Sequence, residues 1–164
     1  MSNTKRITVI AGDLTFRHLI REGLNALGVT AITSADSFDV AQEIMWIATP
    51  DLLILEYEVR GACCLDLVHK IRDGGIIGCP SDAPIIVIAD FPPGDERGAA
   101  VATQVLGAGV TACVSNQFSL RTFIPVVQNA LDHESLPARV EEHLPTALSR
   151  LATSMQRVLF PSGA

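Results

Sequence analysis

The sequence is poor in aromatic residues and in clustered positive charge. Aromatic residues make up 5% of the chain, with one Trp and one Tyr, so the stacking surfaces that bind single-stranded nucleic acids are missing. The 12 basic side chains are outnumbered by 18 acidic ones, and the net charge is -6. No cluster of Lys and Arg could neutralise several phosphates in succession. This composition argues against direct binding to nucleic acids.

Signals for export and for membrane insertion are also missing. Residues 1–6 lack the apolar segment of a signal peptide, and no stretch approaches the roughly 18 apolar residues that span a membrane. The sequence contains four cysteines: Cys63, Cys64, Cys79 and Cys113. They show neither CxxC spacing nor a histidine at a zinc-finger interval. We therefore expect a cytoplasmic protein with reduced thiols, no metal centre, no cofactor and no membrane association.

Five short apolar runs alternate with segments of helical periodicity. The runs are residues 7–11, 30–33, 52–55, 85–89 and 111–114. This alternation predicts an α/β protein in which a parallel sheet is covered by helices on both faces. Short, right-handed crossovers favour the flavodoxin-like strand order 2-1-3-4-5. The sequence therefore predicts a three-layer (βα)5 sandwich.

Two of the helical segments show their apolar faces clearly. The first predicted face comprises Phe16, Leu19, Ile20, Leu24 and Leu27, and the last comprises Leu120, Phe123, Ile124, Val127 and Leu131. The first helix is expected to end at Gly28, because glycine tolerates the left-handed conformation that follows many helices. Residues 72–83 are rich in Gly and Pro, which predicts an irregular surface loop.

The composition changes after residue 132, which divides the chain into a body, residues 1–132, and an extension, residues 133–164. Pro145 can begin an additional amphipathic helix in the extension. Its apolar residues recur at steps of three and four: Leu148, Leu151, Ala152, Met155, Val158 and Leu159. This helix either folds back on its own body or pairs with another subunit or a partner, and a homodimer is one expectation.

A single carboxylate closes the third apolar run. Residues 52–55 follow Pro50 closely and read as a strand that is buried on both faces, and Glu56 comes directly after them. Open α/β sheets hold their sites at the carboxyl ends of the strands. Glu56 is therefore the first candidate for a functional residue.

Four stretches of the body carry a likeness to a known family. They are residues 49–61 (TPDLLILEYEVRG), 65–72 (LDLVHKIR), 83–89 (APIIVIA) and 108–119 (AGVTACVSNQFS). Over about residues 6–131 the chain resembles the receiver domain of bacterial two-component response regulators. The resemblance implies a signalling role and a site at which an aspartate is phosphorylated with the help of Mg²⁺.

The positions that carry this chemistry are altered. The resemblance places the acidic pair that holds Mg²⁺ at Ala11 and Gly12, with Asp13 just beyond them. The remaining positions are Glu56 for the phosphorylated aspartate, Ala89 for the hydroxyl residue, Cys113 for the aromatic switch residue and Asn116 for the lysine. Each original group meets a charge that the reaction creates, and these replacements do not supply such groups. The resemblance therefore implies a degenerate receiver.

Glu56 has two interpretations in such a site. It is either a permanent negative charge that imitates a phosphorylated aspartate or a remnant without a switching role. Burial would raise the pKa of Glu56 and favour its neutral form, so the first interpretation requires a hydrogen-bond donor, for which Asn116 is the candidate. Asp13, after a one-residue shift in its turn, and Asp90 are the candidates for a rearranged metal site. Asp90 has a capping or turn role as its alternative.

We predict a non-enzymatic signalling module that binds a protein partner without phosphorylation. The predicted surface is formed by the fourth helix, the fifth strand and the fifth helix, or by the C-terminal helix. Two alternatives remain open. One is a receiver that is still phosphorylated or binds Mg²⁺ through rearranged acids, and the other is a small-molecule binder or enzyme on a flavodoxin-like scaffold.

Overall fold

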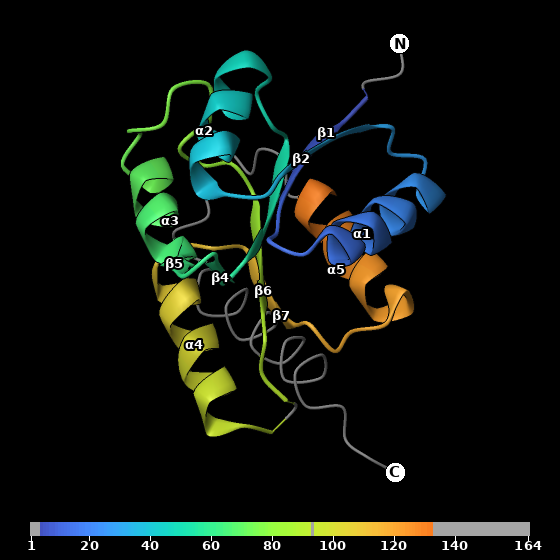
Figure 1. Ribbon diagram of the computed structural model, residues 1–164, viewed down its shortest axis with the longest axis vertical. Helices are drawn as coiled ribbons and strands as arrows, with labels where there is room; N and C mark the ends of the chain where they lie inside the picture. Colours follow the sequence, from blue (N-terminus) through green and yellow to red (C-terminus); the bar gives the residue numbers. More distant parts are fainter. Residues whose placement is uncertain (1–3, 93, 133–164) are drawn as a thin grey trace.

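Five parallel strands form the central sheet. The computed structural model describes residues 4–92 and 94–132, and Figure 1 shows their arrangement. The strands are β1 (Arg6–Ile10), β2 (Ala31–Ala35), β3 (Leu52–Glu56), β6 (Ile85–Ala89) and β7 (Ala112–Ser115). Their order is β2-β1-β3-β6-β7, with parallel pairing throughout. This confirms the predicted order, since β6 and β7 are the fourth and fifth strands of the sheet.

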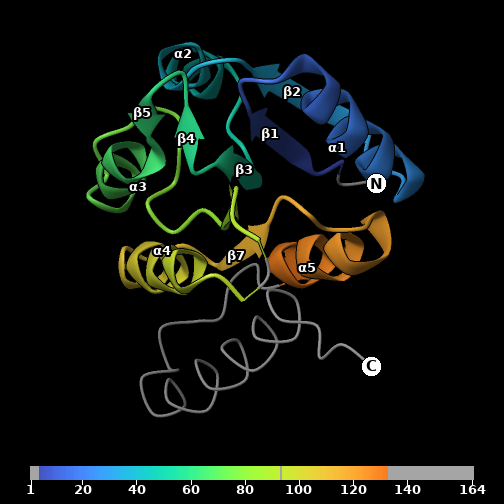
Figure 2. The ribbon, with the colours of Figure 1, turned by 60° about the horizontal axis from the view of Figure 1, so that its bottom comes forward.

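Five helices cover the two faces of the sheet. They are α1 (Leu14–Ala26), α2 (Phe38–Ile47), α3 (Cys64–Arg72), α4 (Glu96–Gly107) and α5 (Leu120–Asp132). Figure 2 shows α1 and α5 on one face and α2, α3 and α4 on the other. The predicted three-layer sandwich is thereby confirmed.

Residues 52–55 of β3 and all of β6 are continuously apolar because each side of the sheet has its own core. Alternate side chains point to opposite faces, so Val9 and Ile54 pack under α1 and α5 while Ile10 and Leu55 pack under α2, α3 and α4. All five residues of β6 are buried. A strand buried on both faces has no polar side, which explains the unbroken apolar runs in the sequence.

Side-chain caps mark where α1 and α2 begin. Asp13 accepts a hydrogen bond from the backbone N–H of Phe16 at the start of α1, and Ser37 accepts one from Val40 at the start of α2. These bonds satisfy N–H groups that have no partner within the helix. At the other end of α1, Gly28 adopts φ 82°, as expected for the residue that follows this helix.

The structure corrects three details of the sequence prediction, of which the first concerns α1. Leu19 is 44% exposed, so it does not belong to the buried face of α1. That face is centred on Ile20 and Leu24, and Gly23 lies against the side chain of Leu120 from α5. Leu19 lies beside this face and is partly in solvent.

A short hairpin after β3 is the second difference. Strands β4 (Glu58–Val59) and β5 (Ala62–Cys63) pair antiparallel outside the main sheet. Arg60 and Gly61 join them with φ values of 52° and 78°, as in the tight turns that suit such hairpins. Two residues per strand are too few to show a periodic pattern in the sequence.

The loop between α3 and β6 is irregular, as predicted, but it is only partly a surface loop. Its residues Ile76, Cys79 and Ala83 are buried in the core under α2, α3 and α4. Arg72 holds the loop in place by donating hydrogen bonds to the backbone carbonyls of Ser81 and Gly109, at 2.8 and 2.9 Å. The loop is therefore part of the packed body.

The remaining expectations have different outcomes. All four cysteines are free thiols, and three of them are buried. Within residues 4–92 and 94–132, no helix is long and apolar enough to cross a membrane. The predicted C-terminal helix and its pairing fall in residues 133–164, outside the described residues.

Candidate functional site at the carboxyl edge of the sheet

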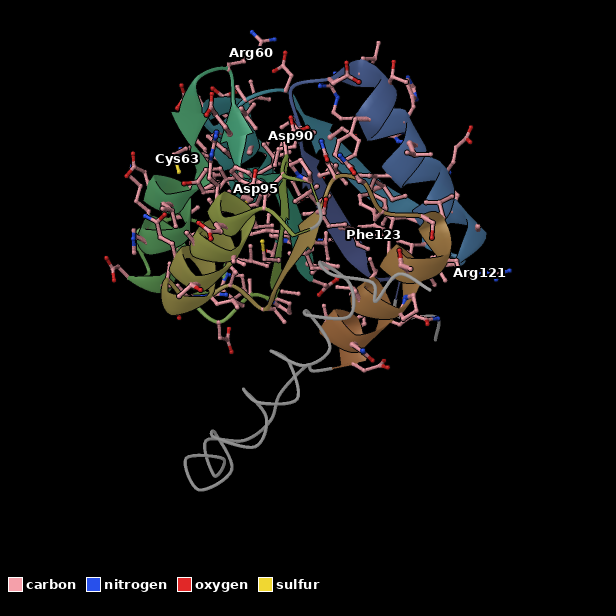
Figure 3. The ribbon with its side chains drawn as sticks, turned by 90° about the horizontal axis from the view of Figure 1, so that it is seen from below. Arg60, Cys63, Asp90, Asp95, Arg121 and Phe123 are labelled. Carbon is pink, nitrogen blue, oxygen red and sulfur yellow. The ribbon has the colours of Figure 1, made fainter. Side chains whose placement is uncertain are left out.

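The carboxyl ends of four strands bring most of the candidate residues together. Glu56 ends β3, Asp90 follows β6, Asn116 follows β7, and Gly12 lies just beyond β1. Figure 3 looks onto this edge, with Asp90 labelled. The parallel sheet places these residues side by side although they are far apart in the sequence, as the resemblance implies.

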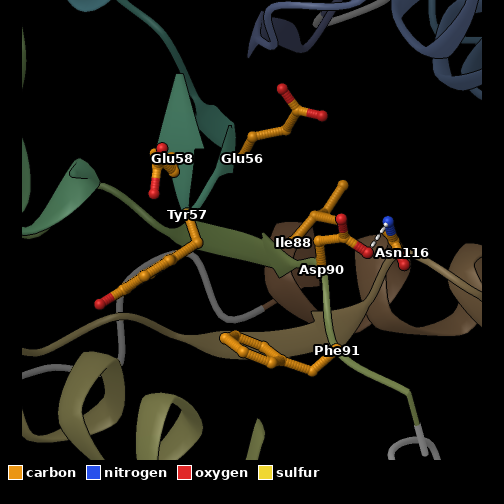
Figure 4. A pocket seen from close by; sticks show the side chains of 7 residues that line it. All are labelled: Glu56, Tyr57, Glu58, Ile88, Asp90, Phe91 and Asn116. Carbon is orange, nitrogen blue, oxygen red and sulfur yellow. Dashed lines mark hydrogen bonds between the residues drawn. The ribbon is translucent and has the colours of Figure 1, made fainter. Parts of the chain in front are cut away.

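A cavity of about 400 Å³ opens at this edge. Its lining residues are Glu56, Tyr57, Glu58, Ile88, Asp90, Phe91 and Asn116 (Figure 4). Three of these residues are carboxylates, and none of those described is a Lys or Arg. The cavity therefore has a negative lining.

Glu56 is held by the backbone of the neighbouring turn. The N–H of Gly12 donates a hydrogen bond of 2.8 Å to Oε2 of Glu56. Partial burial raises the pKa of Glu56, and the nearby charges of Asp13 and Asp90 raise it further, while the Gly12 bond and the charge of Arg17 oppose the rise. The direction agrees with the prediction, because burial is the largest cause.

Asn116 does not donate to Glu56. Its Nδ2 donates to Oδ1 of Asp90 at 2.7 Å, and its backbone N–H donates to the carbonyl of Ala89. Its Oδ1 is buried and finds no hydrogen-bond partner among the described residues. The donor that the sequence suggested for Glu56 is thus engaged with the other carboxylate of the cavity, as the dashed line in Figure 4 shows.

Asp13 is occupied by the helix that it begins. Its Oδ1 accepts from the N–H of Phe16 at 2.7 Å, and the residue is the N-cap of α1. Ala11 and Gly12 offer no side-chain oxygen, and the described residues contain no group of three or more His, Cys, Asp or Glu that could hold a metal ion. The residues present do not fit a magnesium ion in the manner that the resemblance implies.

Arg17 is the cation that sequence reasoning missed. It lies in the first turns of α1, and its Nη1 donates to the carbonyls of Ala11 and Gly12 at 2.5 and 3.2 Å. Arg17 thereby fixes the same turn that binds Glu56. A signal existed in the sequence, since Arg17 stands one helical turn after Asp13 and can therefore reach the preceding loop.

The other replaced positions are buried. Ala89 and Cys113 are 3% and 1% exposed, and burial raises the pKa of the Cys113 thiol to about 12. Such a thiol is inert at neutral pH, because only the thiolate reacts. Ser115, a second residue that sequence reasoning missed, donates from its hydroxyl to the carbonyl of Phe91 and accepts from the N–H of Gln117. Its role is to shape the loops around the cavity.

Comparisons with known proteins show similarity in structure and none in sequence. No protein-family model matches the chain, and no curated protein matches it. A putative response regulator from Chloroflexus aurantiacus is 19% identical, with a TM-score of 0.66 over 78% of this chain and 98% of that chain. A two-component response regulator from Clostridium difficile is 19% identical, with a TM-score of 0.66 over 79% and 97% of the two chains.

An orphan response regulator of H. pylori gives the same result at lower identity. It is 16% identical, with a TM-score of 0.63, and the match covers 78% of this chain and 97% of that chain. Identities this low show a shared fold alone. The body of this chain has the receiver fold of response regulators.

Proposed function

We propose that this protein is a pseudo-receiver: a non-enzymatic signalling module that binds a protein partner without being phosphorylated. One observation carries the proposal. The carboxylate of Glu56 is bound to the backbone N–H of Gly12, in a cavity whose described lining contains three carboxylates and no cationic side chain. A site that accepts a phosphoryl group requires the opposite balance of charge.

A phosphoryl group adds about 1.5 to 2 negative charges near neutral pH. Receivers of the resembled family offset that charge with Mg²⁺ and a lysine, and here the corresponding positions hold Ala11, Gly12 and Asn116. Arg17, the cation whose charge acts on Glu56, already donates hydrogen bonds to the carbonyls of the β1–α1 turn. Phosphorylation at this edge would therefore add negative charge without a counter-charge.

Acetyl phosphate tests this part of the proposal. The protein is incubated with acetyl phosphate and Mg²⁺, and intact mass is measured for the wild type and for Glu56→Gln. We expect neither chain to gain mass. A gain of one phosphoryl group that is labile to hydroxylamine and absent from Glu56→Gln would overturn the proposal.

We propose that Glu56 supplies a permanent negative charge that holds the body in the conformation that binds the partner. Its bond to Gly12 joins the end of β3 to the turn after β1 without any added phosphate. Glu56→Gln should weaken partner binding if the negative charge matters. Glu58→Gln is the matched control, because Glu58 is an exposed carboxylate on the same cavity.

The binding experiment begins with capture of the partner from the native host on the immobilised full-length chain. The purified partner is then titrated against the wild type and both variants. Weaker binding of Glu56→Gln alone supports the fixed-charge role. Equal affinities together with equal melting temperatures would leave Glu56 as a remnant, without contradicting the pseudo-receiver proposal itself.

Small-molecule binding at the cavity is a second candidate function. The volume of about 400 Å³ falls within the range of ligand pockets. In addition, the buried Oδ1 of Asn116 lacks a partner that a ligand donor could supply. Native mass spectrometry of the purified protein would reveal such a ligand as an added mass that denaturation removes.

A further inference from the structure

Three large apolar side chains are exposed together at the amino edge of the sheet. Trp46, Ile47 and Ile77 are 71%, 86% and 73% exposed, and we call them the amino-edge patch. Trp46 and Ile47 end α2, and Ile77 belongs to the loop between α3 and β6. In Figure 1 the end of α2 and this loop lie at the same end of the molecule, opposite the carboxyl ends of the strands.

Gly78 joins the two parts of the patch. It follows Ile77 and packs so closely on α2 that an added Cβ would lie 2.2 Å from the carbonyl oxygen of Met45 and 2.9 Å from Cα of Trp46. Its φ of 84° is also one that glycine adopts most readily. The loop therefore lies directly against the end of α2, and Ile77 is the residue that precedes this contact.

The patch is preformed. Ile76 and Cys79, on either side of Ile77 and Gly78, are buried in the core, and Arg72 ties the loop to Ser81 and Gly109. A surface that is already ordered loses little conformational entropy when it binds. Exposed tryptophan and isoleucine side chains of this size commonly mark contact sites, since monomers seldom expose contiguous apolar patches above a few hundred Å².

We propose that the amino-edge patch is the docking surface for the C-terminal segment of the same chain, residues 145–160. Apolar residues recur in this segment at helical spacing: Leu148, Leu151, Met155, Val158 and Leu159. An amphipathic segment and an apolar surface each leave apolar area in water, and their contact removes both. This inference does not depend on the proposed function of the carboxyl edge.

The place where the body ends makes the contact reachable. Helices that alternate with parallel strands run antiparallel to them, so α2 and α5 both end at the amino edge of the sheet. The body ends there at Asp132. Residues 133–144 can span roughly 40 Å when extended, which exceeds the diameter of a domain of this size.

Charge also favours this occupant. The charged residues of segment 145–160 are Arg150 and Arg157, both positive, whereas the whole chain has a net charge of -6. Glu43 is exposed one helical turn before Trp46 and Ile47, and Asp82 is exposed in the same loop as Ile77. Docking of the segment would therefore bring net positive charge to a side of the body that carries exposed acidic residues.

Trp46 supplies the test, because it is the only tryptophan in the chain. Its fluorescence therefore reports on the patch alone. In the full-length wild type we expect blue-shifted emission and weak quenching by acrylamide. The double variant Leu151→Asp/Met155→Asp should shift the emission to the red and raise the quenching constant severalfold.

Two controls isolate the contact. Ser149→Asp/Thr153→Asp adds the same charge to the polar side of the predicted helix and should leave Trp46 protected. On the body, Ile47→Asp should release the segment, whereas Leu19→Asp, at an exposed apolar residue of α1, should not. Far-UV circular dichroism checks that each variant is folded.

The emission of Trp46 and its dependence on protein concentration distinguish the outcomes. Emission of a fully exposed Trp46 in the wild type, unchanged by the apolar-face variant, would exclude docking. Protection that rises with protein concentration and accompanies a dimer in light scattering would assign the patch to a second copy, and so would also overturn it. Protection that is constant over a hundredfold range of concentration, in a monomer, supports it.

Discussion

The two edges of the sheet differ in how their side chains are satisfied. At the carboxyl edge, Glu56, Asp90 and Asp13 all accept hydrogen bonds from neighbouring groups of the chain. At the amino edge, Trp46 and Ile47 stand in solvent next to a tightly packed loop. The carboxylates of the carboxyl edge are thus paired within the chain, although Oδ1 of Asn116 has no partner among the described residues, and Leu14 and Val40 are exposed in the first turns of α1 and α2. The amino edge carries the most exposed large apolar side chains, Ile47, Ile77 and Trp46.

This difference suggests that the amino edge gains more from binding another surface than the carboxyl edge does. Polar groups that are already paired gain little from a ligand, because binding would exchange one hydrogen bond for another. Burial of exposed apolar side chains by a surface of complementary shape lowers the free energy. Among the described residues, the large exposed apolar side chains lie on α1, α2 and the α3–β6 loop. The surface of α4, β7 and α5, expected from the resemblance, stays a prediction.

The largest effect is expected where the amino-edge loop meets α2. Gly78→Ala should lower the free energy of unfolding by roughly 3–5 kcal/mol, since it combines a left-handed conformation with a clash against the Met45 backbone. Gly74→Ala is the matched control. Gly74 has φ 74° but nothing within 4 Å, so about 1–2 kcal/mol is expected. Urea denaturation measures both, and equal losses would show that the loop does not press on α2.

A smaller loss is expected when the same loop is released from its anchor. Arg72→Ala removes two charge-assisted hydrogen bonds, to Gly109 and Ser81, and should cost about 2–3 kcal/mol. Arg121→Ala is the control, because Arg121 is exposed on α5 and projects away from the body in Figure 3. It should change stability by less than about 0.5 kcal/mol. Thermal melting measures both variants, and equal melting temperatures would contradict the role of Arg72 as an anchor.

At the carboxyl edge, Asp13 distinguishes a cap from a metal ligand. Asp13→Ala should cost about 1 kcal/mol because α1 loses its N-cap, while Asp13→Asn keeps the capping oxygen and should cost only a few tenths. Chemical denaturation with and without Mg²⁺ measures both. Stabilisation of the wild type by Mg²⁺ that both variants lose would instead assign Asp13 to a metal site.

The smallest effect concerns the pH dependence of Glu56. Burial raises its pKa above the ordinary 4.5, so the folded state holds the proton more tightly than the unfolded state. The resulting penalty is absent below the ordinary pKa and is fully present above the folded one. Glu56→Gln should therefore stabilise the protein slightly at neutral pH, and this gain should vanish in acid.

Melting curves at pH 7 and in acid measure this difference. Glu58→Gln, at an exposed carboxylate, is expected to change little at either pH. A gain for Glu56→Gln that persists in acid would show that the effect arises from packing and not from protonation.

Much of the fold follows from patterns that the sequence displays directly. The run of Ile85–Ala89 is apolar without interruption because a strand between two helical layers has no polar side, and its predicted bounds match the structure. The order of the strands follows from the short, right-handed crossovers. Leu19 was misplaced because helical spacing alone does not locate the centre of a buried face. The contact between Gly23 and Leu120 does locate it.

For the site, the order of residues along the chain was enough to predict which groups stand at the ends of the strands. It identified Glu56, Asp90 and Asn116, and it identified the absence of side-chain oxygens at Ala11 and Gly12. The hydrogen-bond partners became known from the folded structure: Glu56 bonds to Gly12, Asn116 to Asp90, and Arg17 to the β1–α1 turn. Likewise, Ile77 and Trp46 lie 31 positions apart in the chain, and the packing of Gly78 against α2 brings their two segments together. Hydrogen bonds and packing contacts depend on distances in space, which the order of residues along a chain does not fix.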